Sequence, residues 1–274
     1  MQVKPLSTTT FEELMDCFYS SFEGYFVKIP TDNAYFKNRW KAAKVDYDLS
    51  FGMFDNDKLV GFIVNAIDCR NGIKIAYNTG TGVIPEYRGR KIVKSIYDVA
   101  FPILKNNDIN TYTLEVITQN IKAIKAYNYV GFDICKTYKC YNHLFSEAQE
   151  SPIDIVTIDA TDFDWSLSKN EHFYSWDNQQ EAITRNSKFS YYLFSKDNKT
   201  LGYSIVDIDN GYIAQIEAFT NTSEDFSLII KALTSFNLNW RINNIDDRLT
   251  EKINAFENLG FQNSIDQYEM IMEV

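Results

Sequence analysis

The chain has 274 residues, a length that suits two domains better than one. Hydrophobic residues make up 45% of it and aromatic residues 15%, which is enough to fill packed cores and excludes a disordered chain. The net charge of −10 disfavours nonspecific binding to nucleic acid or to anionic membranes.

The four cysteines and two histidines form no pattern typical of a zinc site or a disulfide scaffold. No stretch approaches the ~20 apolar residues of a membrane helix, and residues 1–11 lack the apolar core of a secretory signal. We therefore expect no metal, a reducing environment and a cytoplasmic location, with neither nucleic acid nor membrane as a partner. The oligomeric state stays open.

In the first half, the hydrophobic pattern changes from helix to strand and back. Apolar residues at helical spacing predict helices over 11–26 and 32–43, the second with Thr31 or Asp32 as its N-cap. A meander of three antiparallel strands follows at 50–54, 59–67 and 73–83, with turns at 55–57 and at Asn71-Gly72. The remaining elements are a helix over 88–105 that Pro102 kinks or shortens, a strand over 112–117, a helix from Asn120 to Val130 closed by Gly131, and a strand over 132–141.

Residues 146–152 are polar, carry a proline and predict a boundary between domains at 1–145 and 152–274. Beyond the boundary a similar pattern returns, with strands at 191–194, 201–207 and 212–219, helices at 226–236 and 253–259, and a last strand at 264–272.

Three short matches indicate that the second half is a copy of the first. They are AYNYVGF at 126–132 with AFENLGF at 255–261, LVGF at 59–62 with TLGY at 200–203, and the Asn-Gly pairs at 71–72 and 210–211. Each match alone is weak, but they occur in the same order at similar separations. The expected fold class is α/β, more strictly α+β, with each half a mixed, mostly antiparallel sheet flanked by helices.

The segment 79–100 (TGTGVIPEYRGRKIVKSIYDVA) carries the chemistry. Four cations lie within seven residues at the start of its helix, with no acid among them: Arg88, Arg90, Lys91 and Lys94. Cations at a helix N-terminus oppose the helix dipole, and free backbone N–H groups point out of the same end. Such a site suits a bound phosphate, although a solvated basic turn would have the same sequence.

Residues 82–89 (GVIPEYRG) resemble the acetyl-CoA-binding motif of the GNAT N-acetyltransferases. Downstream, a second motif of that family is similar to Leu114-Glu115-Val116, Asn120, Ala123, Tyr127 and Gly131-Phe132, and residues 59–62 are similar to its second strand. The resemblance covers residues 10–145 and implies that residues 1–145 form an acetyl-CoA-binding N-acetyltransferase domain.

The resemblance also implies roles for single residues. Strand 73–83 should splay from its neighbour, so that the backbone of Gly82, Val83 and Ile84 pairs with the pantetheine arm and holds the oxyanion. The pyrophosphate should lie on the segment Arg88, Gly89, Arg90, Lys91, Ile92, Val93 and Lys94. Asn120 should contact the cofactor arm, and Tyr127 should protonate the departing thiolate.

Some of these roles have plain alternatives. Tyr127 could simply pack in the core, and Glu115, the nearest carboxylate for a general base, could be an ion-paired strand residue. The family pattern is Arg/Gln-x-x-Gly-x-Gly/Ala, but Lys91 and Val93 stand where small residues are expected. These departures put the affinity for acetyl-CoA in doubt.

The second half lacks the basic loop. Asn221-Thr222-Ser223-Glu224-Asp225 stands in its place, and Phe256 matches Tyr127. Because acids repel pyrophosphate and phenylalanine has no hydroxyl, we expect this half to bind no acetyl-CoA. It would instead shape the acceptor cleft or stabilise the first half.

The expected activity is direct transfer of an acetyl group from acetyl-CoA to an amine of a small molecule or peptide. The acceptor would lie against residues 22–35, and the negative charge mildly suits a cationic acceptor. Two alternatives stay open. An aminoacyl-tRNA-dependent transferase needs a broad basic surface, which one basic island does not provide. A non-catalytic coenzyme A-binding pseudoenzyme or sensor agrees with the departures at Lys91 and Val93.

Overall fold

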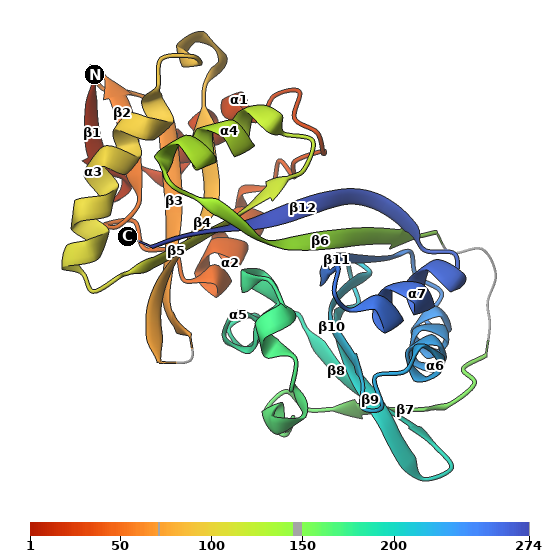
Figure 1. The fold of residues 1–274 in the computed structure, drawn as a ribbon. Helices are drawn as coiled ribbons and strands as arrows, with labels where there is room; N and C mark the ends of the chain where they lie inside the picture. The colour runs from red at the N-terminus through yellow and green to blue at the C-terminus, as the bar shows by residue number, and fades with distance from the viewer. Residues whose placement is uncertain (71, 145–149, 274) are drawn as a thin grey trace. The chain divides into compact units, whose positions relative to one another are not determined.

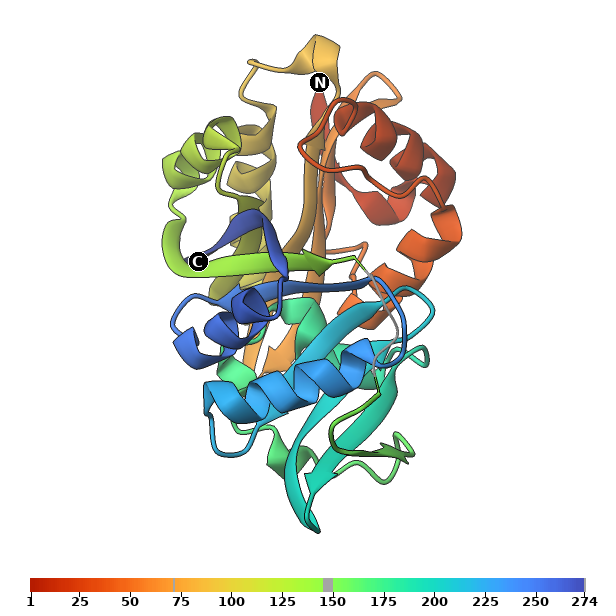
Figure 2. The same ribbon diagram turned by 90° about the vertical axis from the view of Figure 1, so that its right-hand side faces the viewer.

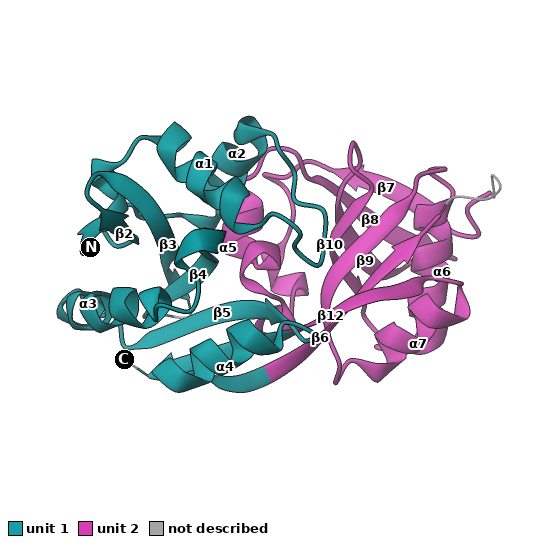
Figure 3. Cartoon of the chain, turned by 90° about the horizontal axis from the view of Figure 1, so that it is seen from above, with its two compact units in different colours: residues 1–135, 268–274 teal, residues 136–267 magenta. Residues whose placement is uncertain are grey.

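The computed structural model describes residues 1–70, 72–144 and 150–273. Asn71, in the first predicted turn, and residues 145–149, at the predicted boundary, lie outside the described residues. The chain divides into two compact units: Met1–Cys135 with Tyr268–Val274, and Lys136–Gln267 (Figure 3).

Unit 1 follows the predicted order of elements, with one short strand added at the start. Its elements are β1 (Gln2–Pro5), α1 (Phe11–Ser21), α2 (Asn33–Ala43), β2 (Phe51–Asp55), β3 (Lys58–Arg70), β4 (Ile73–Val83), α3 (Ile92–Asn106), β5 (Thr111–Ile117), α4 (Ile121–Val130) and β6 (Asp133–His143) (Figure 1). Strands β1 to β4 pair antiparallel, and β4 pairs with β5 in parallel. Helices α1 and α2 cover one face of this sheet, and α3 and α4 cover the other (Figure 2).

Local capping explains where several of these helices begin and end. The side chain of Thr10 accepts the N–H of Glu13, whose carboxylate returns to Thr10 and completes a capping box for α1. Asp32 caps α2, as one of the two predicted residues. Asn120 caps α4, and Gly131 ends it in the left-handed conformation, as predicted.

Helix α1 ends at Ser21, five residues before the predicted end at residue 26. Gly24 adopts φ +70° and turns the chain away from the helix. The apolar residues beyond Ser21 that suggested a longer helix lie instead in the connection between α1 and α2.

Unit 2 repeats the meander but not the first helices. Its elements are β7 (Asp154–Ile158), α5 (Gln180–Thr184), β8 (Ser190–Lys196), β9 (Lys199–Asp207), β10 (Tyr212–Ala218), α6 (Ser223–Thr234), β11 (Trp240–Asp246), α7 (Thr250–Asn258) and β12 (Gln262–Glu273). Strands β7 and β11 and helix α5 were not predicted. Short 3-10 turns and α5 occupy residues 165–184, where a copy of α1 and α2 would lie.

Strands β6 and β12 each belong to both units and lie side by side (Figure 1). In unit 1 the strand order is β1-β2-β3-β4-β5-β12-β6, and in unit 2 it is β12-β6-β11-β10-β9-β8-β7. The end of β12 therefore inserts between β5 and β6 of unit 1. Its residues Met270 and Met272 are buried in the unit 1 core.

The compact units thus differ from the expected division at 1–145 and 152–274. Residues 136–143 of β6 belong to unit 2, and residues 268–273 of β12 belong to unit 1. The reason is strand pairing: Trp240–Asp246 of β11 pairs antiparallel with Tyr138–His143. Each sequence half supplies one strand that completes the sheet of the other unit.

Candidate active site

The centre of the site is the point where β4 parts from β5. Their parallel pairing runs from Ile75 opposite Thr111 to Asn78 opposite Leu114, and β4 then continues to Val83 paired with β3. The predicted splay is therefore present. We call residues 79–83 of β4 and 115–117 of β5 the fork.

A β-bulge opens the fork. Val64 of β3 lies opposite Gly80, and the next residue, Asn65, lies opposite Asn78, so Thr79 is the extra residue. The buried side chain of Asn78 holds the bulge, because its Oδ1 accepts the N–H of Gly80 at 3.0 Å. Its Nδ2 donates to Thr81 Oγ1 at 2.6 Å and to the Tyr97 hydroxyl at 2.8 Å.

Gly82 is a glycine because α1 lies against it. A Cβ there would lie 2.6 Å from Ser21 Cβ and 2.7 Å from the Phe62 ring. The same face of β4 carries Gly80, which has ordinary contact distances to Phe18. Thr81, between the two glycines, points to the opposite face, toward α3 and α4.

The backbone of the fork offers one edge to a ligand. Ile84 donates its N–H to Val60 O at 3.1 Å and so faces β3. Because successive residues of a strand turn their amides to opposite edges, Val83 faces the fork. Of the three residues expected to pair with pantetheine, Val83 is the one whose amide is turned that way.

Helix α3 begins without a side-chain cap. Its N-cap residue is Lys91, in the left-handed conformation at φ 59°, and its first turn holds no acid. This is the position where the family pattern has glycine, so the lysine takes up a conformation that glycine adopts without strain. The N–H groups of the first helical turn point out of this end, and such groups bind anions in many proteins.

The cations near this terminus have different surroundings. Arg88 donates from Nη2 to Ser21 O at 3.0 Å and from Nε to Val83 O at 3.2 Å, so it ties the loop to the C-terminus of α1. Arg90 lies over the Tyr87 ring at 4.6 Å and donates to Glu86 O. Lys94 forms an ion pair with Asp98 at 2.5 Å, which raises its pKa.

The apolar residues of the expected phosphate segment are structural. Ile92 is buried, and its Cγ2 would lie 2.9 Å from a Cβ at Gly61 of β3. Val93 packs against the edge of the unit 1 core. Gly89 is exposed at φ +76° with open space around it. Ile92 and Val93 therefore anchor the helix, while Gly89 and Lys91 shape the loop.

Tyr127 lies on α4 with its side chain directed to the fork and 8% of it exposed. Burial raises the pKa of its hydroxyl to about 12, while the nearby side chain of Thr81 acts in the opposite direction. Tyr25, from the α1–α2 connection, is near enough to raise the pKa further. A tyrosine with this pKa is fully protonated at neutral pH and can act as an acid.

Asn120 has two roles at the start of α4. Its Oδ1 accepts the N–H of Ala123 at 3.2 Å, which caps the helix. Burial raises the pKa of the nearby Tyr25 hydroxyl, and the Asn120 side chain lowers it by a smaller amount. No pattern in the sequence predicted that Asn120 and Tyr25 lie close together.

Glu115 lies on the other face of β5. Tyr112, Leu114 and Val116 are buried toward α3 and α4, so strand alternation turns Glu115 away from Tyr127. The carboxylate and the phenol therefore approach the fork from opposite faces of the sheet. This arrangement keeps Glu115 as a candidate base on the face that α1 and α2 cover.

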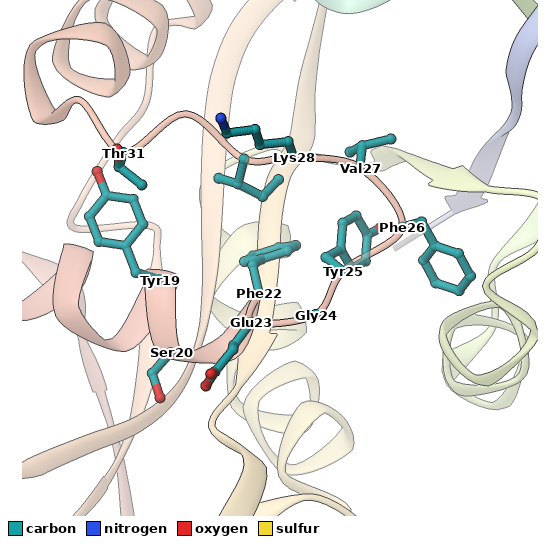
Figure 4. Close-up of a pocket in the computed structure, with 11 residues that line it drawn as sticks. Tyr19, Ser20, Phe22, Glu23, Gly24, Tyr25, Phe26, Val27, Lys28 and Thr31 are labelled. Carbon is teal, nitrogen blue, oxygen red and sulfur yellow. The ribbon is translucent and has the colours of Figure 1, made fainter.

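The α1–α2 connection forms a hollow of about 670 Å³ (Figure 4). Its lining is Tyr19, Ser20, Phe22, Glu23, Gly24, Tyr25, Phe26, Val27, Lys28, Ile29 and Thr31. Three of the rings follow one another edge to face, Phe22 to Tyr25 at 4.9 Å and Tyr25 to Phe26 at 5.4 Å. These residues overlap the segment 22–35 that was expected to receive the acceptor.

Unit 2 has a fork of the same geometry with other side chains. Strands β10 and β11 pair up to Ile213 opposite Ile242, and Ala214 is then the bulged residue. Gly61 opposite Val83 in unit 1 corresponds to Gly202 opposite Ala218 in unit 2. By this register Glu217 takes the place of Gly82.

Glu217 fills the unit 2 fork with a buried ion pair. Its Oε1 accepts from Lys252 Nζ of α7 at 2.8 Å and from the Tyr174 hydroxyl at 2.5 Å. The side chains of both Glu217 and Lys252 are almost fully buried.

The start of α6 is capped by its own protein groups. Thr222 accepts the N–H of Asp225, and Glu251 accepts the N–H of Ser223. At α6 the N–H groups of Ser223 and Asp225 are thus bonded to side chains, whereas no side chain caps α3. This difference explains physically why a phosphate site is expected in unit 1 alone.

No group of His, Cys, Asp and Glu in the described ranges could hold a metal ion, and no cysteine there forms a disulfide. Within those ranges no helix is long and apolar enough to cross a bilayer.

Comparison with known proteins agrees with this geometry. Residues 8–132 match the model of the "Acetyltransferase (GNAT) family". A curated relative, N-alpha-acetyltransferase 30 of Schizosaccharomyces pombe, is 26% identical over 110 residues, which are 40% of this chain and 68% of the relative.

Two solved structures share the fold over nearly the whole chain. A GCN5-related N-acetyltransferase from Sphaerobacter thermophilus has a TM-score of 0.72 at 9% identity, covering 99% of this chain and 95% of its own. A tandem GNAT protein from the clavulanic acid biosynthesis pathway has a TM-score of 0.70 at 16% identity, covering 99% and 98%. Residues 8–132 thus match the GNAT acetyltransferase family, and the chain as a whole shares the fold of a tandem GNAT protein.

Proposed function

We propose that unit 1 transfers an acetyl group from acetyl-CoA to an amine of a small molecule or peptide, by direct attack within a ternary complex. The observation that carries this proposal is the uncapped N-terminus of α3, beside Arg90 and Lys91, at the end of a splayed β4. An anion at that terminus would accept hydrogen bonds from the free N–H groups and offset the positive charge of the neighbouring cations.

Acetyl-CoA would supply the activated acyl group as a thioester. Val83 would donate its fork-facing N–H to the thioester oxygen as negative charge develops there. Tyr127 would give its proton to the departing sulfur, and Asn120 would orient the arm from the start of α4. Glu115 would take the proton of the amine from the opposite face of the sheet.

The acceptor would enter at the hollow of the α1–α2 connection. Its aromatic rings suit an apolar portion of the acceptor, and Glu23 lies there among them. The related protein from Schizosaccharomyces pombe carries the name of an N-alpha-acetyltransferase, which supports a peptide amine among the acceptors to be tested.

Calorimetry with acetyl-CoA tests the donor site. We expect saturable binding with one molecule per chain, because α6 is capped and the unit 2 fork is filled. The double variant Arg90→Ala/Lys91→Ala should bind at least tenfold more weakly. The double variant Lys196→Ala/Lys199→Ala removes the same charge from the β8–β9 hairpin and should bind normally. A stoichiometry near two, or equal loss in both double variants, would contradict the assignment.

Turnover separates an enzyme from a coenzyme A-binding pseudoenzyme. Tyr127→Phe keeps the ring and removes the proton donor. In an enzyme it should lower kcat by about 10²-fold or more while the affinity for acetyl-CoA stays the same. If wild-type protein binds acetyl-CoA but no amine is acetylated, and Tyr127→Phe changes nothing, the protein is a pseudoenzyme.

A further inference from the structure

One arginine connects the end of β4 with the end of α1. Arg88 donates from Nε to the carbonyl oxygen of Val83 at 3.2 Å and from Nη2 to that of Ser21 at 3.0 Å. A guanidinium presents its N–H groups in a fixed planar arrangement, so one side chain can hold both carbonyl groups at once. We call these two hydrogen bonds the Arg88 bridge.

At α1 the bridge supplies a cation that the helix itself lacks. The last turn of α1 holds no basic residue, and the carbonyl end of a helix carries partial negative charge. Ser21 is buried there and lies so close to the fork that a Cβ at Gly82 would be 2.6 Å from its own Cβ. Arg88 therefore holds the end of α1 at the place where this helix contacts β4.

At β4 the bridge bonds a residue whose backbone faces the fork. Ile84 donates its N–H to Val60 O of β3, so both the N–H and the C=O of Val83 turn away from β3. Arg88 bonds the C=O and leaves the N–H of Val83 to a ligand. The bridge thus fixes the strand end that we propose to hold the thioester.

The hollow of the α1–α2 connection begins at the same place. Ser20 and Phe22, the neighbours of Ser21 in the chain, both line it (Figure 4). The N–H of Phe22 bonds Phe18 O at 3.1 Å, and the N–H of Tyr25 bonds Phe22 O at 3.1 Å. The start of the connection therefore continues from the last turn of α1, and a shift of Ser21 would move the first residues of the hollow.

Unit 2 has neither the first helices nor the arginine. Ile84, whose N–H bonds Val60 O, corresponds to Phe219, whose N–H bonds Leu201 O. Residues 220–225, which follow, contain no cation. Short 3-10 turns and α5 stand there in place of α1 and α2. A strand of this kind thus leads into its helix without a bridge, and the arginine occurs in the unit that has the hollow.

We propose that Arg88 is a positioning residue that links the donor strand to the acceptor hollow and does not bind the phosphates. This inference rests on the proposed acetyl transfer. When the arm of acetyl-CoA pairs with the N–H of Val83, it fixes the end of β4. Through the Arg88 bridge, the last turn of α1 is then held in one position, and the start of the connection opens less often.

Hydrogen exchange measured by mass spectrometry tests the bridge without any activity. In Arg88→Met, the amides of residues 19–29 should exchange about tenfold faster than in the wild type, because two charged hydrogen bonds are lost. Arg88→Lys keeps the charge on one nitrogen and should give an intermediate rate. Lys105→Met removes a cation from the last turn of α3 and should leave these amides unchanged. Equal rates in Arg88→Met and the wild type would overturn the proposal.

Acetyl-CoA then tests the coupling. At saturating acetyl-CoA, exchange in residues 19–29 should slow about threefold in the wild type and in Lys105→Met, but not in Arg88→Met. A residue that only capped α1 would speed exchange in the free protein and leave the response to acetyl-CoA intact. That result would overturn the proposal.

Calorimetry separates the bridge from a phosphate contact. Arg88→Met should bind acetyl-CoA within about threefold of the wild type, because no bond to phosphate is lost. A loss of about tenfold, as expected for Arg90→Ala/Lys91→Ala, would make Arg88 a phosphate ligand and overturn the proposal. If the wild type binds no acetyl-CoA while Arg88→Met still speeds exchange in residues 19–29, the link between β4 and α1 stands and the proposed function fails.

Discussion

At the scale of single residues, Lys91 combines two properties that oppose each other. Its charge suits a phosphate, but its backbone lies in the left-handed region that disfavours side chains with a Cβ. The surrounding loop is open, so the strain arises from the residue itself and not from crowding.

We predict that Lys91→Gly stabilises the protein by about 1 kcal/mol, because glycine adopts this φ without strain. Lys91→Ala loses the same charge but keeps the Cβ, so it should give no gain in the free energy of unfolding in urea. Both should weaken acetyl-CoA binding to a similar degree if the charge binds phosphate. Tighter binding by Lys91→Gly than by the wild type would show that the Cβ obstructs the loop.

The buried phenols predict a loss of stability at alkaline pH. Burial holds the pKa values of Tyr97 and Tyr112 well above 10 and raises that of Tyr127 to about 12. These pKa values are higher in the folded protein than in the unfolded chain. The free energy of unfolding is therefore unaffected while all three tyrosines are protonated, and it decreases as pH rises above about 10.

The measurement is urea unfolding from pH 8 to 11, with phenolate absorbance recorded on the folded protein. Each buried tyrosine should contribute about 1.4 kcal/mol per pH unit to the loss above pH 10. Tyr127→Phe should show a shallower fall. Full phenolate absorbance from the folded protein at pH 10 would contradict the prediction.

Many residues of this site could be predicted from sequence, but the contacts between them could not. The motif located Tyr127, Asn120 and the cations, since these follow local spacing. It could not show that Arg88 bonds Ser21, 67 residues away, or that Thr81 and Tyr25 meet α4. Such contacts depend on how distant elements pack. One contact could have been predicted from the pattern TGTG at 79–82, because two glycines on one face of a strand indicate close approach of a helix.

At the scale of elements, strand β4 depends on the close approach of helix α1 to its glycines. The glycines at 80 and 82 differ in the space that surrounds them, although both point toward α1. This difference gives a matched pair of substitutions within one strand.

We predict that Gly82→Ala destabilises unit 1 by about 1–3 kcal/mol, since its Cβ would lie 2.6 Å from Ser21 Cβ. Gly80→Ala should be neutral or slightly stabilising, because its nearest neighbour would be Phe18 at 3.6 Å. Urea denaturation of both variants gives the comparison. Equal destabilisation would mean that the bulge, and not the contact with α1, requires glycine.

The strands that sequence did not predict were missed for two physical reasons. Strand β11 reads WRINNID, and its polar residues hide a strand that is mostly buried. Strands β1 and β7 are four and five residues long, too short for a clear alternation. The long, strongly periodic elements were predicted because their pattern repeats over several turns or pleats.

At the scale of the whole molecule, the strand exchange could not be predicted. The strands at 132–141 and 264–272 have the alternating pattern of any strand beside a core, and the pattern does not say which sheet each one joins. The pairing is decided by contacts far apart in sequence, such as Cys135 Sγ with the carbonyl oxygen of Glu269. Two structural units built from exchanged strands are therefore compatible with a tandem repeat in sequence.

The exchange predicts that residues 1–145 alone do not form a stable unit 1. This fragment lacks the end of β12, so β5 and β6 lose the strand between them and the core loses Met270 and Met272, both buried. Large buried side chains contribute about 2–5 kcal/mol each, which is comparable with the stability of a whole domain. Adding residues 262–273 through a Gly/Ser linker after residue 143 should restore cooperative unfolding. The same linked fragment with Met270 and Met272 both changed to Asp should not regain it. Cooperative unfolding of the bare fragment as a monomer would show that β12 is dispensable, and unit 1 would then be the independent domain that the sequence alone predicts.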